Sequence, residues 1–239
     1  MPHVSATVPE ANLLLCEHCG YVLSGLGGSE RCPECGRLVA ESDPALRQPC
    51  QWEKRPGAGS FISTTWMVLV RPTQFFRSLA IRTGEQSRRF AAIHFALASV
   101  ILGAGLWLHA GWYLSMAGTG LGRIWVLGLL PCIGGTFLML LLATELGGRA
   151  TAWEAAYRGL RLPIDVVRRS MHYHSAHYFP VAVFTFITIA AYRIWDAKGN
   201  GAAYGINYLY ILCGEIIVFA AYLFKTYWIG MRNVMYANS

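Results

Sequence analysis

Phe90–Leu114 reads FAAIHFALASVILGAGLWLHAGWYL, and this stretch decides the fold. A helix that crosses the hydrocarbon core of a bilayer needs about 20 mostly apolar residues, and this segment is long enough. Three more segments of the same kind follow it, at about 124–146, 176–195 and 206–229. The sequence therefore predicts an all-α membrane bundle of four transmembrane helices, spanning about 90–114 and these three ranges, in a lipid bilayer.

The composition of the chain agrees with a lipid environment. Of the 239 residues, 54% are hydrophobic and 14% are charged, whereas a soluble domain is about 25% charged. The formal net charge is +7, which fits either nucleic acid or a membrane surface, depending on where the basic residues fall. We expect the cysteines to stay reduced, because the amino end lacks the pattern of a secretory signal peptide.

The basic residues gather on one side of the four expected spans. That side holds Arg71, Arg77, Arg82, Arg88, Arg89, Arg149, Arg158, Arg161, Arg168 and Arg169. The other side holds Arg123 and Lys198, with Arg193 just inside a helix end. Because Lys and Arg are enriched in cytoplasmic loops, we expect an integral membrane protein with both termini in the cytoplasm, and we assign it to a bacterial inner membrane.

Two amphipathic segments are expected to lie on the cytoplasmic face. In 151–171, apolar residues from Trp153 to Met171 recur every three or four positions, opposite a face that includes Arg168 and Arg169. Segment 61–82 has a similar pattern, with Pro72 near the first turn of its second half. The sequence predicts interfacial helices in both places.

The amino-terminal region carries two copies of a Cys-x-x-Cys-Gly motif, Cys16–Gly20 and Cys32–Gly36. Glycine after the second cysteine adopts a positive φ without steric cost and lets backbone N–H groups point at the sulfurs. The four thiolates of Cys16, Cys19, Cys32 and Cys35 suit a closed, tetrahedral Zn²⁺ site. A module this small needs the metal in order to fold.

Changes in composition divide the chain into four parts. We expect a flexible lead-in at 1–13, the four-cysteine module at 14–40, a linker at 41–60 and the membrane domain at 61–239. The linker contains Asp43-Pro44, Pro49 and Pro56-Gly57, which disfavour both helix and strand.

At the two motifs the sequence resembles the zinc-ribbon family, in particular short ribbons that read C-x-x-C-G-Y and C-P-x-C-G. This resemblance covers Leu14–Val39 and implies a small β-hairpin zinc ribbon with the four cysteines as metal ligands. The same knuckles resemble rubredoxin and the rubredoxin-like tail of rubrerythrins, which use iron for one-electron transfer. We expect zinc, because electron transfer needs a partner centre and none is recognised, and iron is the alternative.

The membrane region resembles the Yip-type membrane domain. The likeness rests on Arg71–Phe76 (RPTQFF), on Trp153–Arg161 and on the run from Tyr173 to Pro180. Members of that family typically have five spans, whereas four are expected here. The family's members help to organise membranes or bind small GTPases. The resemblance implies a role in membrane organisation and transfers no functional residue.

Four ionisable residues fall within the expected spans or at their ends: His94, Glu145, Arg193 and Glu215. Such a group is costly in a bilayer, so each is first treated as a functional candidate. Glu215 is expected near mid-membrane, where Arg193 could reach it, and His94 could pair with Glu145 near the cytoplasmic interface. We expect structural pairs, with transport that uses Glu215 as the alternative.

Three histidines, His172, His174 and His177, cluster at the start of the third span. The spacing of His174 and His177 is compatible with a metal or haem site, although interfacial histidines are also common. No nucleophile–base pair, phosphate loop or pair of catalytic carboxylates is recognised, so an enzyme is not expected.

Three functions are compatible with these observations. The first is a non-enzymatic membrane protein whose cytoplasmic ribbon binds or positions an unidentified cytoplasmic protein, as a monomer or an oligomer. The second is a membrane-anchored redox protein with an iron site, and the third is a small transporter or channel. A nucleic-acid partner is not expected, because Glu17, Glu30 and Glu34 and four thiolates outweigh Arg31 and Arg37 in the ribbon.

Overall fold

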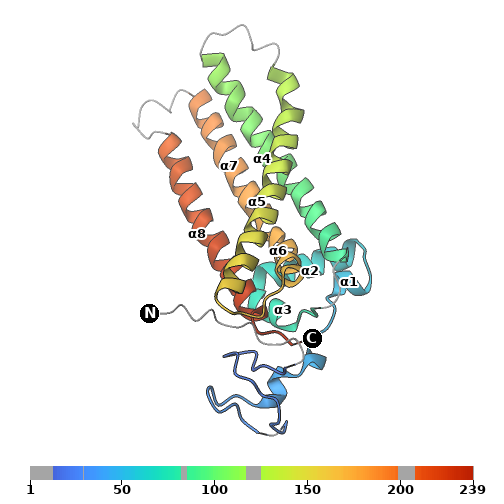
Figure 1. Ribbon diagram of the computed structural model, residues 1–239. Coiled ribbons are helices and arrows are strands. Elements are labelled where there is room, and N and C mark those ends of the chain that lie inside the picture. The colour runs from blue at the N-terminus through green and yellow to red at the C-terminus, as the bar shows by residue number, and fades with distance from the viewer. Residues whose placement is uncertain (1–12, 29, 82–84, 117–124, 199–207, 239) are drawn as a thin grey trace, which may run out of the picture. The chain divides into compact units, whose positions relative to one another are not determined.

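The computed structural model describes residues 13–28, 30–81, 85–116, 125–198 and 208–238 (Figure 1). Its α-helices are α1 (Gln51–Lys54), α2 (Ala58–Val70), α3 (Pro72–Ser78), α4 (Glu85–Met116), α5 (Leu129–Tyr157), α6 (Ile164–His174), α7 (Tyr178–Ala197) and α8 (Tyr208–Val234). Short 3-10 helices are η1 (Val39–Ser42), η2 (Pro44–Leu46), η4 (Trp125–Gly128) and η5 (Ser175–His177). The described residues contain no β-strand, so the expected β-hairpin of the ribbon is reduced to isolated antiparallel bridges.

Among the described residues, four helices are long and apolar enough to cross a membrane, as the sequence predicts. They are Glu85–Gly111, Leu129–Tyr157, Ile164–Asp196 and Tyr208–Val234. The expected first residues of the second and fourth spans, Ile124 and Ile206, lie outside the described residues, as do Arg82, Arg123 and residues 1–12 of the expected lead-in 1–13.

The chain forms two compact units. The first contains Met1–Ala91, Thr144–His174 and Thr226–Ser239, and therefore holds the cysteine module, α1, α2, α3 and α6. The second contains Ala92–Ala143 and Ser175–Lys225, and therefore holds α7 and parts of α4, α5 and α8. The four cysteines predicted to bind a metal ion therefore all lie in the first unit.

The second unit is a bundle of four helical segments. Phe95 of α4 contacts Phe137 of α5 and Tyr178 of α7, with ring centroids 6.2 Å and 6.1 Å apart. Gly103 brings α4 very close to α5, because a Cβ there would lie 2.7 Å from the Cα of Ile133. Small residues at such crossings are typical of helix packing in membranes.

The core of the first unit is aromatic. The Phe90 ring lies 5.2 Å from that of Phe61 and 5.1 Å from that of Tyr173. Tyr173 also contacts Phe75 at 5.1 Å, and Trp52 contacts Phe61 at 5.7 Å. Because these rings come from five helices, this cluster fixes α1, α2, α3, α6 and the start of α4 to one another.

The structure differs from the single interfacial helix expected over 151–171. α5 continues to Tyr157, and α6 begins only at Ile164. Gly159 adopts a φ of 70° between them, and Pro163 precedes α6, so the helix is interrupted at the residues that favour a break. The expected polar face is also different, because Arg169 is buried within the first unit.

The segments 61–82 and 41–60 also differ from expectation in detail. The first forms two helices that meet at Arg71, with Pro72 at the first position of α3. On α2, Ile62, Trp66 and Val70 recur every fourth residue and are exposed, as an interfacial helix requires. The expected linker 41–60 is folded rather than irregular, because it contains η2 and α1.

Candidate metal centre

The four predicted ligands converge on one point in the first unit. The Sγ atoms of Cys16, Cys19, Cys32 and Cys35 all lie within 4.8 Å of one another. The sulfurs of Cys16 and Cys35 are 3.5 Å apart, and those of Cys19 and Cys32 are 3.6 Å apart. A tetrahedral ion with metal–sulfur bonds of about 2.3 Å places its sulfurs about 3.8 Å apart, whereas a disulfide requires about 2.05 Å. The arrangement therefore fits a metal ion and excludes a disulfide.

The two knuckles have the same backbone hydrogen bonds. The N–H of Cys16 donates to the carbonyl of Tyr21 at 2.8 Å, and the N–H of Cys32 donates to that of Arg37 at 2.7 Å. Gly20 and Gly36, with φ of 84° and 71°, each close a turn onto the carbonyl of the first cysteine. The positive φ is the reason for glycine at these positions.

A small core supports the sulfurs. Leu23 and Val39 follow the first cysteine of each knuckle by seven residues, and both are buried against Cys16 and Cys32. Cys19 and Cys35 remain partly exposed. The ribbon thus has two equivalent halves, and a metal ion held by all four sulfurs would join them.

Backbone groups also tune the thiols. Burial acts against the thiolate of Cys32, but N–H groups of Cys35 and Glu34 and the thiols of Cys19 and Cys35 outweigh it and lower the Cys32 pKa to about 7. Burial raises the pKa of the Cys19 thiol. The N–H groups at Cys32 stabilise negative charge on sulfur, which a metal-binding thiolate requires.

An ion pair that sequence reasoning missed fixes the ribbon within the first unit. The Arg47 guanidinium donates to both carboxylate oxygens of Glu17 at 2.8 Å, and the two side chains are 3% and 9% exposed. Arg47 also donates to the carbonyls of Phe76, Leu79 and Asn233. One arginine therefore connects the ribbon with α3 and the end of α8. No local pattern around Arg47 marks it as buried.

The carboxyl-terminal segment closes the other side of the ribbon. The Asn238 amide accepts from the N–H of Leu15 at 2.9 Å and donates to the carbonyls of Leu15 and Ser42 at 2.8 Å and 2.9 Å. Arg161 donates to the Asn238 side chain at 2.8 Å and to the carbonyl of Leu13 at 2.6 Å. The ribbon is thus a docked part of the first unit.

A second buried ion pair lies in the same unit. Arg169 donates to both oxygens of Glu53 at 2.6 Å, and the side chains are 3% and 4% exposed. The Tyr173 hydroxyl donates to Glu53 at 2.7 Å, and the Cys50 thiol donates to that hydroxyl at 3.2 Å. This network joins α1 to α6 and explains why Arg169 is buried.

The four ionisable residues that were expected within or at the ends of the spans have different neighbours. Glu145, in the first unit, lies 3.4 Å from Arg168 and 4.0 Å from His172. His94, in the second unit, is buried. Arg193 lies 3.7 Å from Asp196, and the Oε2 atom of Glu215 is buried without a hydrogen-bond partner among the described residues.

Each residue of the histidine cluster bonds to a different hydroxyl group. His172 contacts Ser87 at 3.1 Å, His174 contacts Thr226 at 2.9 Å, and His177 contacts Tyr222 at 2.7 Å. Among the residues that the structure describes, the four cysteines are the group of His, Cys, Asp or Glu side chains that could hold a metal ion.

Comparison of the chain with protein-family models, with curated proteins and with solved structures found no match.

Proposed function

We propose that this chain is a non-enzymatic integral membrane protein whose cytoplasmic zinc ribbon binds a partner protein and positions it at the membrane. The observation that carries the proposal is the closed four-thiolate cluster, clamped within the first unit by the buried Arg47–Glu17 pair. Four protein ligands leave no coordination position for a substrate, which favours a structural ion. The clamp would hold a protein bound to the ribbon at a fixed place beside α3.

The surface of the ribbon supports a protein partner. Tyr21, Val22 and Leu38 are 38%, 41% and 39% exposed, although the module has few apolar residues to bury. Aromatic and aliphatic side chains of this kind are typical of the centre of a protein interface. The acidic balance of the ribbon disfavours nucleic acid.

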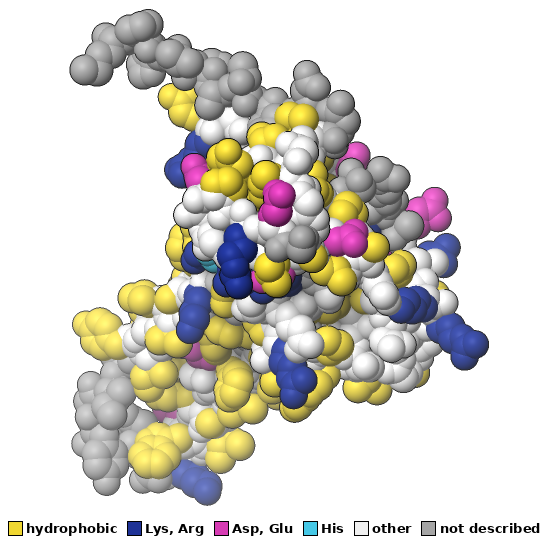
Figure 2. All heavy atoms as spheres, turned by 90° about the horizontal axis from the view of Figure 1, so that it is seen from below, with side chains coloured by type: hydrophobic (Ala, Val, Ile, Leu, Met, Phe, Trp, Pro, Cys, Tyr) yellow, Lys and Arg dark blue, Asp and Glu magenta, His cyan; other side chains and the backbone are white. Residues whose placement is uncertain are grey.

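The distribution of charge supports a cytoplasmic first unit. Of the 20 basic residues, the second unit contains Arg123, Arg193, Lys198 and Lys225, and the first contains the remainder. Figure 2 shows Lys and Arg side chains beside hydrophobic ones on the face seen there. By the positive-inside rule, both termini face the cytoplasm, and a bacterial inner membrane suits this arrangement. The membrane organisation that the Yip-type resemblance implies is one form of such a role.

Cross-linking in intact membranes tests the proposal. We expect the double variant Val22→Ser/Leu38→Ser and the variant Cys19→Ser to lose the proteins that cross-link to the wild type. Leu46→Ser is the matched control, because Leu46 is 58% exposed and lies outside the ribbon. An unchanged metal content in the double variant shows that its ribbon is folded. Identical sets of cross-linked proteins in all four chains contradict the proposal.

Electron transfer is a second candidate, supported by the partial exposure of Cys19 and Cys35. A tetrahedral thiolate site also accepts iron, and exposed sulfurs favour exchange of electrons with a partner. An iron site would give a coloured protein with a visible absorption spectrum, whereas a zinc protein is colourless.

Transport is a third candidate, supported by the buried Oε2 atom of Glu215 in α8. A carboxyl group in such a place is costly and is often part of an ion or proton path. The variant Glu215→Gln would then abolish flux in proteoliposomes while the protein remains folded. Equal flux in the wild type and the variant contradicts this role.

A further inference from the structure

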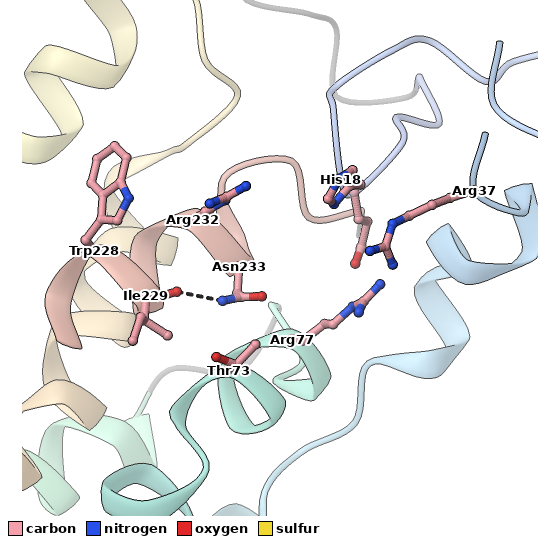
Figure 3. Close-up of a pocket in the computed structure, with 9 residues that line it drawn as sticks. His18, Arg37, Thr73, Arg77, Trp228, Ile229, Arg232 and Asn233 are labelled. Carbon is pink, nitrogen blue, oxygen red and sulfur yellow. Dashed lines mark hydrogen bonds between the residues drawn. The ribbon is translucent and has the colours of Figure 1, made fainter. Parts of the chain in front are cut away.

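A pocket of about 300 Å³ opens in the first unit beside the ribbon (Figure 3). Three parts of the first unit line it: the ribbon, α3 and the last turns of α8. Each element contributes a basic side chain, namely Arg37 from the ribbon, Arg77 from α3 and Arg232 from α8. The docking of the ribbon therefore brings together arginines that are far apart in the sequence.

The three arginines are not fully neutralised by the surrounding protein. Glu41 accepts from Arg37 at 3.2 Å and from Arg77 at 3.5 Å, so one carboxylate oxygen serves two guanidinium groups. Arg232 is exposed and forms no ion pair with a described residue. Figure 3 shows Arg37 and Arg77 pointing toward one another, with Arg232 reaching toward the ribbon. Like charges gathered in this way repel one another unless an anion lies between them.

Glu17 is the acidic side chain among the described residues that line the pocket. Both of its oxygens accept hydrogen bonds from Arg47 at 2.8 Å, so its charge is already matched by a buried cation. His18, on the same knuckle, adds a polar ring to the wall. The pocket therefore presents an excess of positive charge and of N–H donors.

The remaining wall is partly apolar. Trp228 and Ile229 line the pocket from α8, and Trp228 is 47% exposed. They lie in the last two turns of a helix that is long and apolar enough to cross a membrane. Tryptophan and arginine at such a helix end are typical of the layer where phospholipid headgroups lie.

We propose that this pocket binds a phosphate group, carried either by the headgroup of an anionic phospholipid or by a free phosphate compound. Arg37, Arg77 and Arg232 would donate charge-assisted hydrogen bonds to the phosphate oxygens, because the guanidinium fork matches phosphate geometry. Trp228 would pack against the glycerol and upper acyl chain if the ligand is a lipid. Basic pockets beside transmembrane helices on the cytoplasmic side suit such headgroups. Binding of a phospholipid headgroup, in contrast to a free phosphate compound, rests on the proposed function as a membrane protein.

Equilibrium binding to the full-length, delipidated protein in a neutral detergent tests the pocket. The probe is labelled phosphatidylglycerol, and the competitors are unlabelled phosphatidylglycerol, phosphatidylcholine and inorganic phosphate. We expect unlabelled phosphatidylglycerol to compete and phosphatidylcholine to compete poorly, because its choline group offsets the charge. Competition by inorganic phosphate at concentrations similar to the lipid assigns the pocket to free phosphate, whereas weak competition assigns it to the headgroup.

Two variants locate the binding. Arg232→Gln and Arg77→Gln each remove one charged donor, and we expect the affinity for phosphatidylglycerol to fall about tenfold or more. Arg158→Gln is the control, because Arg158 is an exposed cation that pairs with Glu154 at 2.6 Å and does not line the pocket. Equal affinities in the wild type and all three variants overturn the proposal. If Arg77→Gln loses its metal, Arg232→Gln carries the test alone, since Arg232 is exposed and forms no ion pair with a described residue.

The same variants separate this inference from the proposed function. Unchanged lipid affinity in Arg232→Gln, with partner cross-linking intact, refutes the pocket and leaves the ribbon's role in place. The opposite result has two parts: Arg232→Gln weakens lipid binding, and the ribbon variants cross-link to the same proteins as the wild type. That result refutes the partner role and leaves the pocket in place.

Discussion

Arg47 and Glu17, which are 30 residues apart in the sequence, form a bidentate ion pair with two bonds of 2.8 Å. The pair is nearly inaccessible to solvent, and it connects the four-cysteine module with the rest of the first unit. Its geometry makes the ribbon part of a larger folded body, so the stability of the ribbon and that of α3 should be coupled.

Removal of Arg47 tests this coupling. Arg47→Ala leaves the Glu17 carboxylate buried without a partner, and we expect a loss of about 3–5 kcal/mol in the free energy of unfolding. Arg47→Lys should recover little of it, because an ammonium group cannot reproduce the bidentate geometry. Thermal unfolding in detergent measures the effect. Arg158→Ala is the control, since an exposed pair contributes no more than about 1 kcal/mol; equal effects of both alanine variants contradict the account.

The Arg169–Glu53 pair is suited to a double-mutant cycle. Arg169→Met or Glu53→Met alone leaves an uncompensated buried charge and should destabilise the protein by about 3–5 kcal/mol. The double variant should be less destabilised than the sum of the two, because it removes both charges. Chemical denaturation measures the free energy of unfolding of each variant. If the loss in the double variant equals the sum of the losses in the two single variants, the two groups do not interact.

Asn238 should protect the amide of Leu15 from hydrogen exchange. Asn238→Ala removes the acceptor of that N–H together with both side-chain donors, and each such bond contributes about 0.5–1.5 kcal/mol. We expect faster exchange at Leu15 and faster loss of metal to a chelator. Asn233→Ala is the matched control, because the Asn233 side chain bonds to Ile229 of its own helix. The same exchange rate in both variants would contradict the docking of the carboxyl-terminal segment.

Gly20 and Gly36 provide an internal comparison of the two knuckles. Both have a positive φ, so alanine at either position should cost about 1–2 kcal/mol. At Gly20 a Cβ would also lie 2.6 Å from Cε1 of Tyr236, whereas a Cβ at Gly36 would have no atom of a described residue within 4 Å. Gly20→Ala should therefore release metal faster than Gly36→Ala. In a Tyr236→Ala background, Gly20→Ala and Gly36→Ala should release metal at the same rate. If Gly20→Ala still releases metal faster, Tyr236 does not lie against the first knuckle.

The features that could be predicted from the sequence are those with a local signal. Cys-x-x-Cys-Gly spacing and long apolar runs are determined by nearby residues, so the cysteine cluster and the four apolar helices were predictable. The break after Tyr157 also had a signal in Gly159 and Pro163, although the amphipathic period of 151–171 suggested one continuous helix.

The features that could not be predicted depend on contacts between distant segments. Asn238 bonds to Leu15 across 223 residues, and Arg169 bonds to Glu53 across 116. A buried arginine has the same local sequence pattern as an exposed one, so Arg169 was expected on the polar face of its helix. The pocket beside the ribbon has the same origin, because Arg37, Arg77 and Arg232 line it together only after the ribbon has docked.

A metal ion held by the four thiolates should fold the ribbon of this protein. The most direct test is the metal content and absorption spectrum of the full-length protein extracted from membranes with detergent, compared with those of Cys19→Ser. We expect one zinc ion per chain in a colourless wild type, and loss of that ion in the variant. A folded wild type without a stoichiometric metal ion, or a variant that retains all of it, contradicts the account.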